Sequence, residues 1–575
     1  MFFLEKIKKE LIDEINKILD VELCDSAFMV PPNADYGDLS LTCFGLAKEK
    51  GISPNDVIEK ITNNISPKEY LKETKEVGPY INFFLNPEVL ARSVIKEVLD
   101  NKENYGNNKN GNGQKVMIEY SNANTHKEYH IGHLRNICFG DAVRNIMAVN
   151  GFKTIPVSYI NDFGIHVAKT IWRLKKYQES EIPENKGYFL GKVYVEATKE
   201  LENNEAGKTE VGEIMKNIEA RRGEDFEIWQ KTREWSIAGF DEIYKNLKVE
   251  FANIFYENEF VEQGSKIVNE LLEKGILIKS ESAIIADLEK YNLGVLVVVR
   301  SDGTALYPAA DLALAMEKFN RFKINKSIYV VDARQWQYFQ QLFKILELAG
   351  FYKDLIHLGY EVVKLPTGAM SSRQGNVITY EDLEDQMMDK SVADTKSKHP
   401  DWPEEKIHLT ARIIAVGAMK FEMLKVGAKQ VITFDINKAL SFEGYTSVYL
   451  QYTYARIRSI LRKAQFSIFN FPPVGDTQFS MNFQFSILNS KEHSLIMKMG
   501  KYPEIIERAK EEFDPSFLTK FLFELAQEFN DYYHAVNILK AENEVKEARL
   551  VLIEAVSRVL INGLGLLGIE VVEEI

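Results

Sequence analysis

The sequence predicts an α/β protein with a doubly wound parallel sheet at its centre, an α+β domain before it and an all-α domain after it. Three observations support this prediction. The apolar run 115–121 is followed by a helical pattern at 133–151 and a second strand-like run at 153–162, which is the order of a βαβ unit. The same alternation returns at 326–365. From about residue 436 onward, the segments have the apolar spacing of amphipathic helices.

Composition and charge are those of an ordinary multidomain globular protein. The chain has 575 residues, of which 45% are hydrophobic and 27% charged, enough for several buried cores. Its net charge of −13 does not exclude a nucleic-acid partner, because such a partner requires only a local basic face. Three scattered cysteines argue for a reducing compartment. With no apolar stretch long enough to span a membrane, we expect a cytoplasmic protein without membrane contact.

Changes in composition divide the chain into three domains. Residues 1–110 carry helical segments, a turn-rich loop and an extended piece, which indicate an α+β domain. The Asn- and Gly-rich segment 101–114 is typical of a linker. We assign residues 111–435 to the central domain, with an insertion at about 172–300, and residues 436–575 to the helical domain.

The segment 124-NTHKEYHIGHLRN-136 lies between the first strand of the expected parallel sheet and the helix that follows it. Parallel sheets bind their ligands at this position, outside the carboxyl ends of the strands. Gly132 allows a ligand to approach the backbone, and the helix N-terminus presents free N–H groups to an anion. His130 and His133 can donate hydrogen bonds to oxygens that gain charge, and Lys127 adds a positive charge.

Two other interpretations of the histidine pair stay open on these residues alone. A zinc site would need further ligands, for which His126 and His166 are the nearest candidates. The pair can also be a helix start without chemistry, because a motif of four residues occurs by chance. Glu119 is more informative by itself: it lies in an otherwise apolar strand, and a buried carboxylate needs a partner.

Together with a second segment, this motif resembles the signature of a known family. HIGH after the first strand is the signature of class I aminoacyl-tRNA synthetases and of some small nucleotidylyltransferases. The segment 368-GAMSSRQGN-376 resembles their second signature, KMSKS, in the form KMSSRKGN that is typical of the arginyl branch. Further stretches resemble the same branch in its order along the chain: 30-VPPNADYGDLS-40, 78-GPYINFFL-85, 119-EYSNANTHKEYHIGHLRN-136, 251-FANIFYENEF-260, 303-GTALYPAADLALAMEKF-319, 441–461 and 546–570.

This resemblance covers nearly the whole chain and implies a ligase that attaches L-arginine to tRNA(Arg). In that family ATP converts arginine to arginyl-adenylate with release of pyrophosphate, and the arginyl group then passes to the terminal adenosine of the tRNA. It implies a Rossmann-like catalytic domain, an N-terminal domain that contacts tRNA, and a helical anticodon-binding domain. We expect ATP with Mg²⁺ as substrate, no zinc, and a monomer.

The resemblance also assigns roles to individual residues. The expected catalytic residues are His130, His133, Lys127 and Arg373. Those expected at ATP are Gly132, Met370, Ser371 and Ser372. Those expected at arginine are Glu119, Asn124, Glu257, Tyr307, Asp311 and Gln335. Those expected at tRNA are Tyr449, Tyr452 and Arg456. Tyrosines at helical spacing are more often part of a core than of an RNA surface, so this last group has a structural alternative.

Specificity for arginine should come from carboxylates, because two oxygens match the planar fork of a guanidinium. We expect Glu257 and Asp311 to hold this group, with Tyr307 beside it, while Glu119, Asn124 and Gln335 match positions that hold the amino-acid part.

The second signature departs from the family pattern. Ala369 and Ser372 replace both of its lysines, so Lys127 or Arg373 must offset the charge of the pyrophosphate. Three alternative functions stay open: a non-catalytic tRNA-binding paralogue, a class I synthetase for another amino acid, and a small-molecule nucleotidylyltransferase. The last of these would leave the helical domain without a role.

Overall fold

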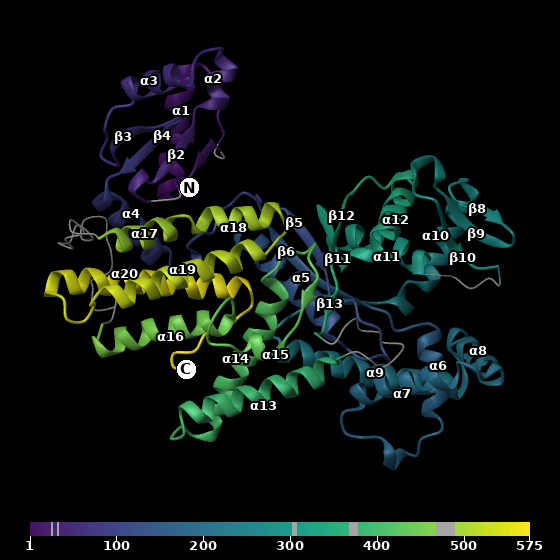
Figure 1. The fold of residues 1–575 in the computed structure, drawn as a ribbon. Helices are drawn as coiled ribbons and strands as arrows, with labels where there is room; N and C mark the ends of the chain where they lie inside the picture. Colours follow the sequence, from purple (N-terminus) through teal and green to yellow (C-terminus); the bar gives the residue numbers. More distant parts are fainter. Residues whose placement is uncertain (25–26, 32–33, 302–306, 367–377, 467–488) are drawn as a thin grey trace.

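The protein consists of an N-terminal α+β unit, a central parallel sheet with two groups of additional elements, and a C-terminal helical bundle (Figure 1). The structure is a computed structural model, and it describes residues 1–24, 27–31, 34–301, 307–366, 378–466 and 489–575. In this part of the chain, no helix is both long and apolar enough to cross a membrane.

The N-terminal unit packs its helices on a small antiparallel sheet. Helix α1 (Phe3–Leu19) buries Leu4, Ile7, Leu11 and Ile15, whose spacing of three or four residues places them on one face. The sheet has the order β1-β2-β4-β3. The elements are β1 (Phe28–Met29), β2 (Leu39–Thr42), α2 (Phe44–Lys50), α3 (Pro54–Asn64), β3 (Leu71–Val77), β4 (Tyr80–Leu85) and α4 (Pro87–Asn101).

The central sheet has five parallel strands in the order β12-β11-β5-β6-β7. Numbered by their succession in the chain and read from β7 to β12, these strands run 3-2-1-4-5, which is the doubly wound order. The expected fold class is therefore confirmed. The order reverses between β5 and β11, and ligands bind at such a reversal. The strands are β5 (Lys115–Glu119), β6 (Lys153–Ile160), β7 (Asn253–Tyr256), β11 (Lys326–Asp332) and β12 (Asp354–Tyr360).

Helix α5 (Ile131–Val149) connects β5 to β6 and begins two residues before the helical pattern in the sequence suggests. The reason is local, because the His130 side chain caps the helix by accepting a hydrogen bond from its first turn. Its buried face includes Leu134, Ile137 and Ile146, as the apolar spacing predicts.

The segment expected as one insertion contributes an edge strand to the central sheet, because β7 pairs in parallel with β6. The chain therefore leaves the sheet twice, first into a group of helices and then into a small antiparallel sheet of order β10-β9-β8 (Figure 1). The first group is α6 (Ile165–Leu174), α7 (Lys186–Glu200), α8 (Glu205–Glu219) and α9 (Gly223–Asn246). The second is α10 (Val261–Glu273), β8 (Ile278–Ser280), β9 (Ala283–Asp287) and β10 (Val295–Val299).

Two helices return the chain to the sheet, and a helical bundle follows. Beyond residue 436, every regular element of the described chain is helical, as the sequence indicates. The remaining elements are α11 (Tyr307–Phe322), α12 (Trp336–Leu348), β13 (Val363–Lys364), α13 (Tyr380–Lys398), α14 (Glu404–Leu424), β14 (Ile432–Thr433), α15 (Ile436–Ala439), α16 (Ser447–Lys463), α17 (Ser490–Gly500), α18 (Tyr502–Glu511), α19 (Ser516–Ala535) and α20 (Asn543–Leu566).

Buried hydrogen bonds fix the sheet to the bundle. The Arg135 guanidinium on α5 donates to the carbonyl oxygens of Gln430 (3.0 Å) and Ala428 (3.1 Å), in the loop that leads to the bundle. The Tyr105 hydroxyl, after α4, donates to the Met499 carbonyl on α17 (3.0 Å). The helix that begins at the histidine motif is thus anchored directly to the C-terminal half.

Candidate active site

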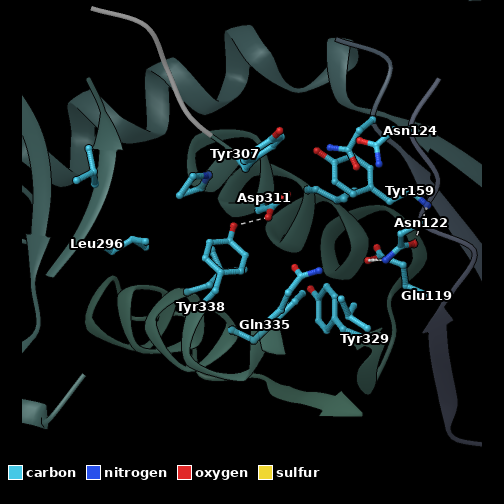
Figure 2. A pocket seen from close by; sticks show the side chains of 17 residues that line it. Glu119, Asn122, Asn124, Tyr159, Leu296, Tyr307, Asp311, Tyr329, Gln335 and Tyr338 are labelled. Atoms are coloured by element: carbon cyan, nitrogen blue, oxygen red, sulfur yellow. Dashed lines mark hydrogen bonds between the residues drawn. The ribbon is translucent and has the colours of Figure 1, made fainter. Parts of the chain in front are cut away.

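A cavity of about 450 Å³ opens at the carboxyl ends of the central strands, where the strand order reverses (Figure 2). Its size is within the range of small-molecule sites. Five of the six side chains expected at arginine line it: Glu119, Asn124, Tyr307, Asp311 and Gln335. Residues from distant parts of the sequence therefore meet at one place.

Glu119 lies at the end of β5 and is only 2% exposed. The fully buried ammonium of Lys318, on α11, forms an ion pair with one of its carboxylate oxygens (2.5 Å). The other oxygen accepts a hydrogen bond from the Asn122 amide (3.3 Å). Lys318 also lies 3.9 Å from the centroid of the Tyr329 ring. The charge of Glu119 is therefore offset inside the protein, which makes it a poor sole partner for a guanidinium.

Asp311 lies on α11 and faces the cavity, where the Tyr338 hydroxyl from α12 donates a hydrogen bond to it (Figure 2). Burial raises the pKa of Asp311 to about 6, although the bond from Tyr338 opposes the rise. The carboxyl is therefore mostly ionised at neutral pH. The cavity thus holds a negative charge that a cationic side chain can approach.

Glu257, the sixth expected residue, lies behind the wall of the cavity. It follows β7, and its carboxylate accepts a hydrogen bond from the amide of Asn161 (3.0 Å), a residue that does line the cavity. Burial, and next the negative charge of Asp311, raise the pKa of Glu257 to about 8. At neutral pH this carboxyl holds its proton for most of the time, and a cation placed nearby would release it.

The two histidines of the motif form a stacked pair at the start of α5, with ring centroids 3.9 Å apart. The Nδ1 atom of His130 accepts from the Gly132 N–H (3.1 Å), and Nδ1 of His133 accepts from the His130 N–H (3.2 Å). Each neutral ring therefore carries its proton on Nε2. Burial lowers the pKa of His130 to about 4 and that of His133 well below its usual value. Both rings are neutral donors at physiological pH.

Lys127 and Gly132 support this pair in different ways. The positive charge of Lys127 contributes to the lowered pKa of both histidines, so it lies near them. Its ammonium is 5.2 Å from the centroid of the Tyr194 ring on α7. A Cβ atom at Gly132 would come within 2.9 Å of the His130 ring. A side chain at this position would therefore displace the capping imidazole of His130.

His126 and His166, the candidate zinc ligands, are buried elsewhere in this region. Both ring nitrogens of His126 contact threonine hydroxyls, those of Thr125 (2.9 Å) and Thr232 (2.7 Å), which attach the motif loop to α9. Burial lowers the pKa of His126 to about 3. Among the described residues, no group of three or more His, Cys, Asp or Glu side chains is placed to hold a metal.

Met370, Ser371, Ser372 and Arg373 lie outside the described residues, as does Ala369. The chain that follows them returns to the histidine motif: the Ile131 N–H donates to the Ile378 carbonyl (3.2 Å), and the Tyr380 N–H donates to the Tyr129 carbonyl (2.7 Å).

The residues expected at tRNA separate into two environments on α16. Tyr449 packs against Phe523 and accepts a hydrogen bond from the Asn530 amide (2.9 Å), which places it against the bundle core. Tyr452 and Arg456 line a surface cavity of about 420 Å³, together with Arg462, Lys463 and Tyr533. Aromatic and basic side chains share this cavity with Glu573 and Glu574, both of which form ion pairs with Arg462. The aromatic and basic members are of the kinds that bind unpaired bases.

Several cavity residues were not identified from the sequence. They are Asn122, Tyr159, Asn161, Tyr329 and Tyr338, with Lys318 directly behind. Asn122 directly follows the expected strand 115–121, and Asn161 lies at the carboxyl end of the expected strand 153–162; this position is a signal that could have found them. The helical pattern around Tyr338 contains no such signal.

The fold, the histidine motif and the cavity define a class I aminoacyl-tRNA synthetase. Residues 94–435 match the family model described as tRNA synthetases class I (R), catalytic domain. Residues 5–85 match the arginyl tRNA synthetase N terminal domain, and residues 450–575 match the DALR anticodon binding domain.

Similar proteins identify the branch. The chain is 35% identical to the arginine–tRNA ligase of Clostridium acetobutylicum, over 99% of both chains. It is 36% identical to that of Bdellovibrio bacteriovorus, over 95% and 94% of the two chains. The solved Thermus thermophilus arginyl-tRNA synthetase superposes with a TM-score of 0.81 at 27% identity, over 99% of this chain and all of that one. The chain belongs to the arginyl-tRNA synthetase family: it is an ATP-using enzyme that joins arginine to tRNA.

Proposed function

We propose that arginine is activated in the cavity at the ends of β5, β6 and β11, with its carboxylate directed toward the histidine pair at the start of α5. The observation that carries this proposal is the meeting of five expected side chains around one cavity next to that helix start.

The guanidinium lies between Asp311 and Glu257, with Tyr307 beside it. Asp311 supplies an ionised carboxylate on the cavity wall. Glu257, which lies behind the wall in contact with Asn161, becomes a second carboxylate when the bound guanidinium releases its proton. Arginine presents a planar fork of N–H donors that two carboxylates can accept together, whereas lysine presents a single ammonium. Charge and shape together select arginine.

The amino-acid end lies toward β5 and β6. Asn124 and Gln335 hold the α-amino and carboxylate groups through hydrogen bonds, and both line the cavity. Glu119 is available to the α-amino group through one oxygen while Lys318 keeps the other neutralised. This division places the reactive carboxylate near the start of α5.

ATP binds on the same side as the histidine motif. The Nε2–H donors of His130 and His133 stabilise the charge that develops on the α-phosphate, and the backbone at Gly132 lies under the adenosine. Lys127 and Arg373 offset the charge of the leaving pyrophosphate. Met370, Ser371 and Ser372 complete the ATP site. Mg²⁺ enters as part of the ATP substrate, held mainly by its phosphates.

Each of the three domains has a different role toward tRNA. Residues 1–110 contact the body of the tRNA, residues 111–435 catalyse both steps with the insertion at about 172–300 beside them, and residues 436–575 bind the anticodon. Within the bundle, Tyr452 and Arg456 contact unpaired bases, while Tyr449 supports them from the core side. The enzyme acts as a cytoplasmic monomer.

Amino-acid-dependent exchange of pyrophosphate into ATP tests this proposal. The exchange should be measured for all twenty amino acids, with and without total tRNA, because the assay reports activation separately from transfer. We expect arginine alone to support exchange. Exchange with another amino acid, or none under either condition, would contradict the assignment of this cavity.

A further inference from the structure

The arginine cavity has a polar and an apolar end. In Figure 2, Leu296 of β10 lies on one side of the Tyr338–Asp311 hydrogen bond, and Glu119, Asn122 and Asn124 lie on the other. Six apolar side chains from β10, α11 and α12 contribute to the lining: Leu296, Val297, Pro308, Leu314, Phe339 and Leu342. The cavity therefore extends past the carboxylate that marks the end of an arginine side chain.

The apolar wall is held in place by α12. Gln341, which is buried, donates a hydrogen bond from its side-chain amide to the Leu293 carbonyl (2.6 Å), immediately before β10. The Lys344 ammonium lies 4.3 Å from the centroid of the Tyr291 ring in the preceding turn. Two consecutive turns of α12 thus fix the small sheet against the cavity. The apolar lining around Leu296 is therefore held in a fixed position by these contacts.

We propose that this apolar end, referred to below as the Leu296 annex, accepts a small apolar substituent on a terminal nitrogen of the guanidinium. The enzyme then binds Nω-alkylated arginines as well as arginine. This inference rests on the proposed position of the guanidinium at Asp311. A guanidinium carries five N–H donors, and one alkyl group replaces only one of them, so the contact with Asp311 survives.

Two opposing effects determine how the affinity for an Nω-alkylated arginine compares with the affinity for arginine. Replacing one N–H removes a charge-assisted hydrogen bond, which weakens binding by about tenfold or more. Each methylene buried from water in the annex strengthens binding by about fourfold. Methyl-arginine should therefore bind more weakly than arginine, and the two further carbons of a propyl group should offset that loss fully, so that propyl-arginine binds about as tightly as arginine.

Calorimetric binding of a ligand series to the full-length protein tests the annex. The ligands are L-arginine and its Nω-methyl, Nω-ethyl and Nω-propyl derivatives. We expect affinity to fall by about tenfold from arginine to the methyl derivative and then to rise about fourfold with each added carbon. An affinity that stays level or falls from methyl to propyl would overturn the proposal.

A variant that fills the annex gives an independent test. Leu296→Trp should lower the affinity for the propyl derivative, relative to that for arginine, by about tenfold. Ile278→Trp is the matched control, because Ile278 is exposed on β8 of the same small sheet and does not line the cavity. An unchanged ratio in a folded Leu296→Trp protein would overturn the annex. If that variant does not fold, the ligand series on the unmodified protein decides.

Asp311→Asn separates the failure of the annex from the failure of the proposed guanidinium site. If Asp311 holds the guanidinium, this change weakens arginine and all its derivatives alike. If arginine binding is unaffected, the position of the guanidinium is wrong. If arginine weakens but the derivatives show no gain with chain length, only the annex is wrong.

Discussion

The carboxyl groups at one cavity form two sets that differ in where their counter-charge comes from: Glu119 and Asp311 line the cavity, and Glu257 lies directly behind its wall. Glu119 is paired with Lys318, both of them buried in the protein interior. Asp311 and Glu257 form no ion pair within the described chain, and each has a raised pKa. Burial of an unpaired carboxyl is unfavourable, and under the proposed function the second set receives its counter-charge from the substrate. We propose that the pairing of Glu119 with Lys318 mainly maintains structure, whereas Asp311 and Glu257 select arginine.

Lys318→Met should produce the largest effect, and it acts on stability. It leaves the Glu119 charge buried without its partner, which typically costs about 3–5 kcal/mol of unfolding free energy. Urea denaturation followed by fluorescence measures this loss. The double change Lys318→Met with Glu119→Leu should recover much of it, because no buried charge remains. If the Lys318→Met protein were as stable as the unmodified protein, Glu119 would not depend on an internal counter-charge, and the proposed difference between Glu119 and the pair Asp311 and Glu257 would be wrong.

The histidine pair should affect rate far more than arginine binding, with a smaller loss of stability because the His130 side chain caps α5. His130→Ala or His133→Ala removes one fixed Nε2–H donor, and loss of such a donor costs about 100- to 1,000-fold in rate, or about 3–4 kcal/mol. Arginine binding, measured by calorimetry, should change little, because neither ring lines the cavity. Full exchange activity in the folded double variant would rule out a role at the phosphate.

Asp311→Asn should act on substrate selection without loss of stability. Removing a charge-assisted hydrogen bond of about 1.5–3 kcal/mol raises the arginine requirement in pyrophosphate exchange by about 10- to 150-fold. Competition by citrulline, the neutral isostere, should become stronger, while the ATP requirement stays the same. The control is Asp354→Asn, at the opposite end of the strands in the same sheet. An unchanged arginine requirement would place the specificity carboxylate elsewhere.

Tyr338→Phe should have the smallest effect. The Tyr338 hydroxyl opposes the rise in the pKa of Asp311, so its loss moves that pKa further upward. Arginine binding should weaken by about three- to tenfold, as expected for one hydrogen bond of about 1 kcal/mol, and most strongly below pH 7. The pH profile of the arginine requirement measures this shift. Tyr352→Phe, at an exposed position, is the matched control.

Much of the fold follows from local patterns in the sequence. The runs at β5, β6 and β11 and the helix α5 were predicted, because apolar periodicity is a property of neighbouring residues. The edge strand β7 was not predicted as part of the central sheet, because its residues lie within the expected insertion at about 172–300. It is only four residues long, and its membership of the sheet depends on pairing with β6, which periodicity does not encode.

The candidate site also contains residues that the sequence pattern singles out and residues that only the folded structure reveals. Glu119 could be singled out because a carboxylate in an apolar strand is conspicuous, but its partner Lys318 lies 199 residues further along the chain. Tyr338 occupies an ordinary helical position, and only the packing of α12 against α11 brings its hydroxyl to Asp311. Contacts between distant segments decide these roles.

Proton release on arginine binding tests most directly whether the unpaired carboxyl pair receives the guanidinium. Glu257, with a pKa of about 8, holds its proton at pH 7, and a bound guanidinium lowers that pKa. Binding should therefore tighten as pH rises from 6 to 8. Calorimetry at pH 7 in two buffers of different ionisation enthalpy should give a release of close to one proton per arginine, lost in Glu257→Gln. Binding without proton release, or the same release in Glu257→Gln, would contradict this role for the pair.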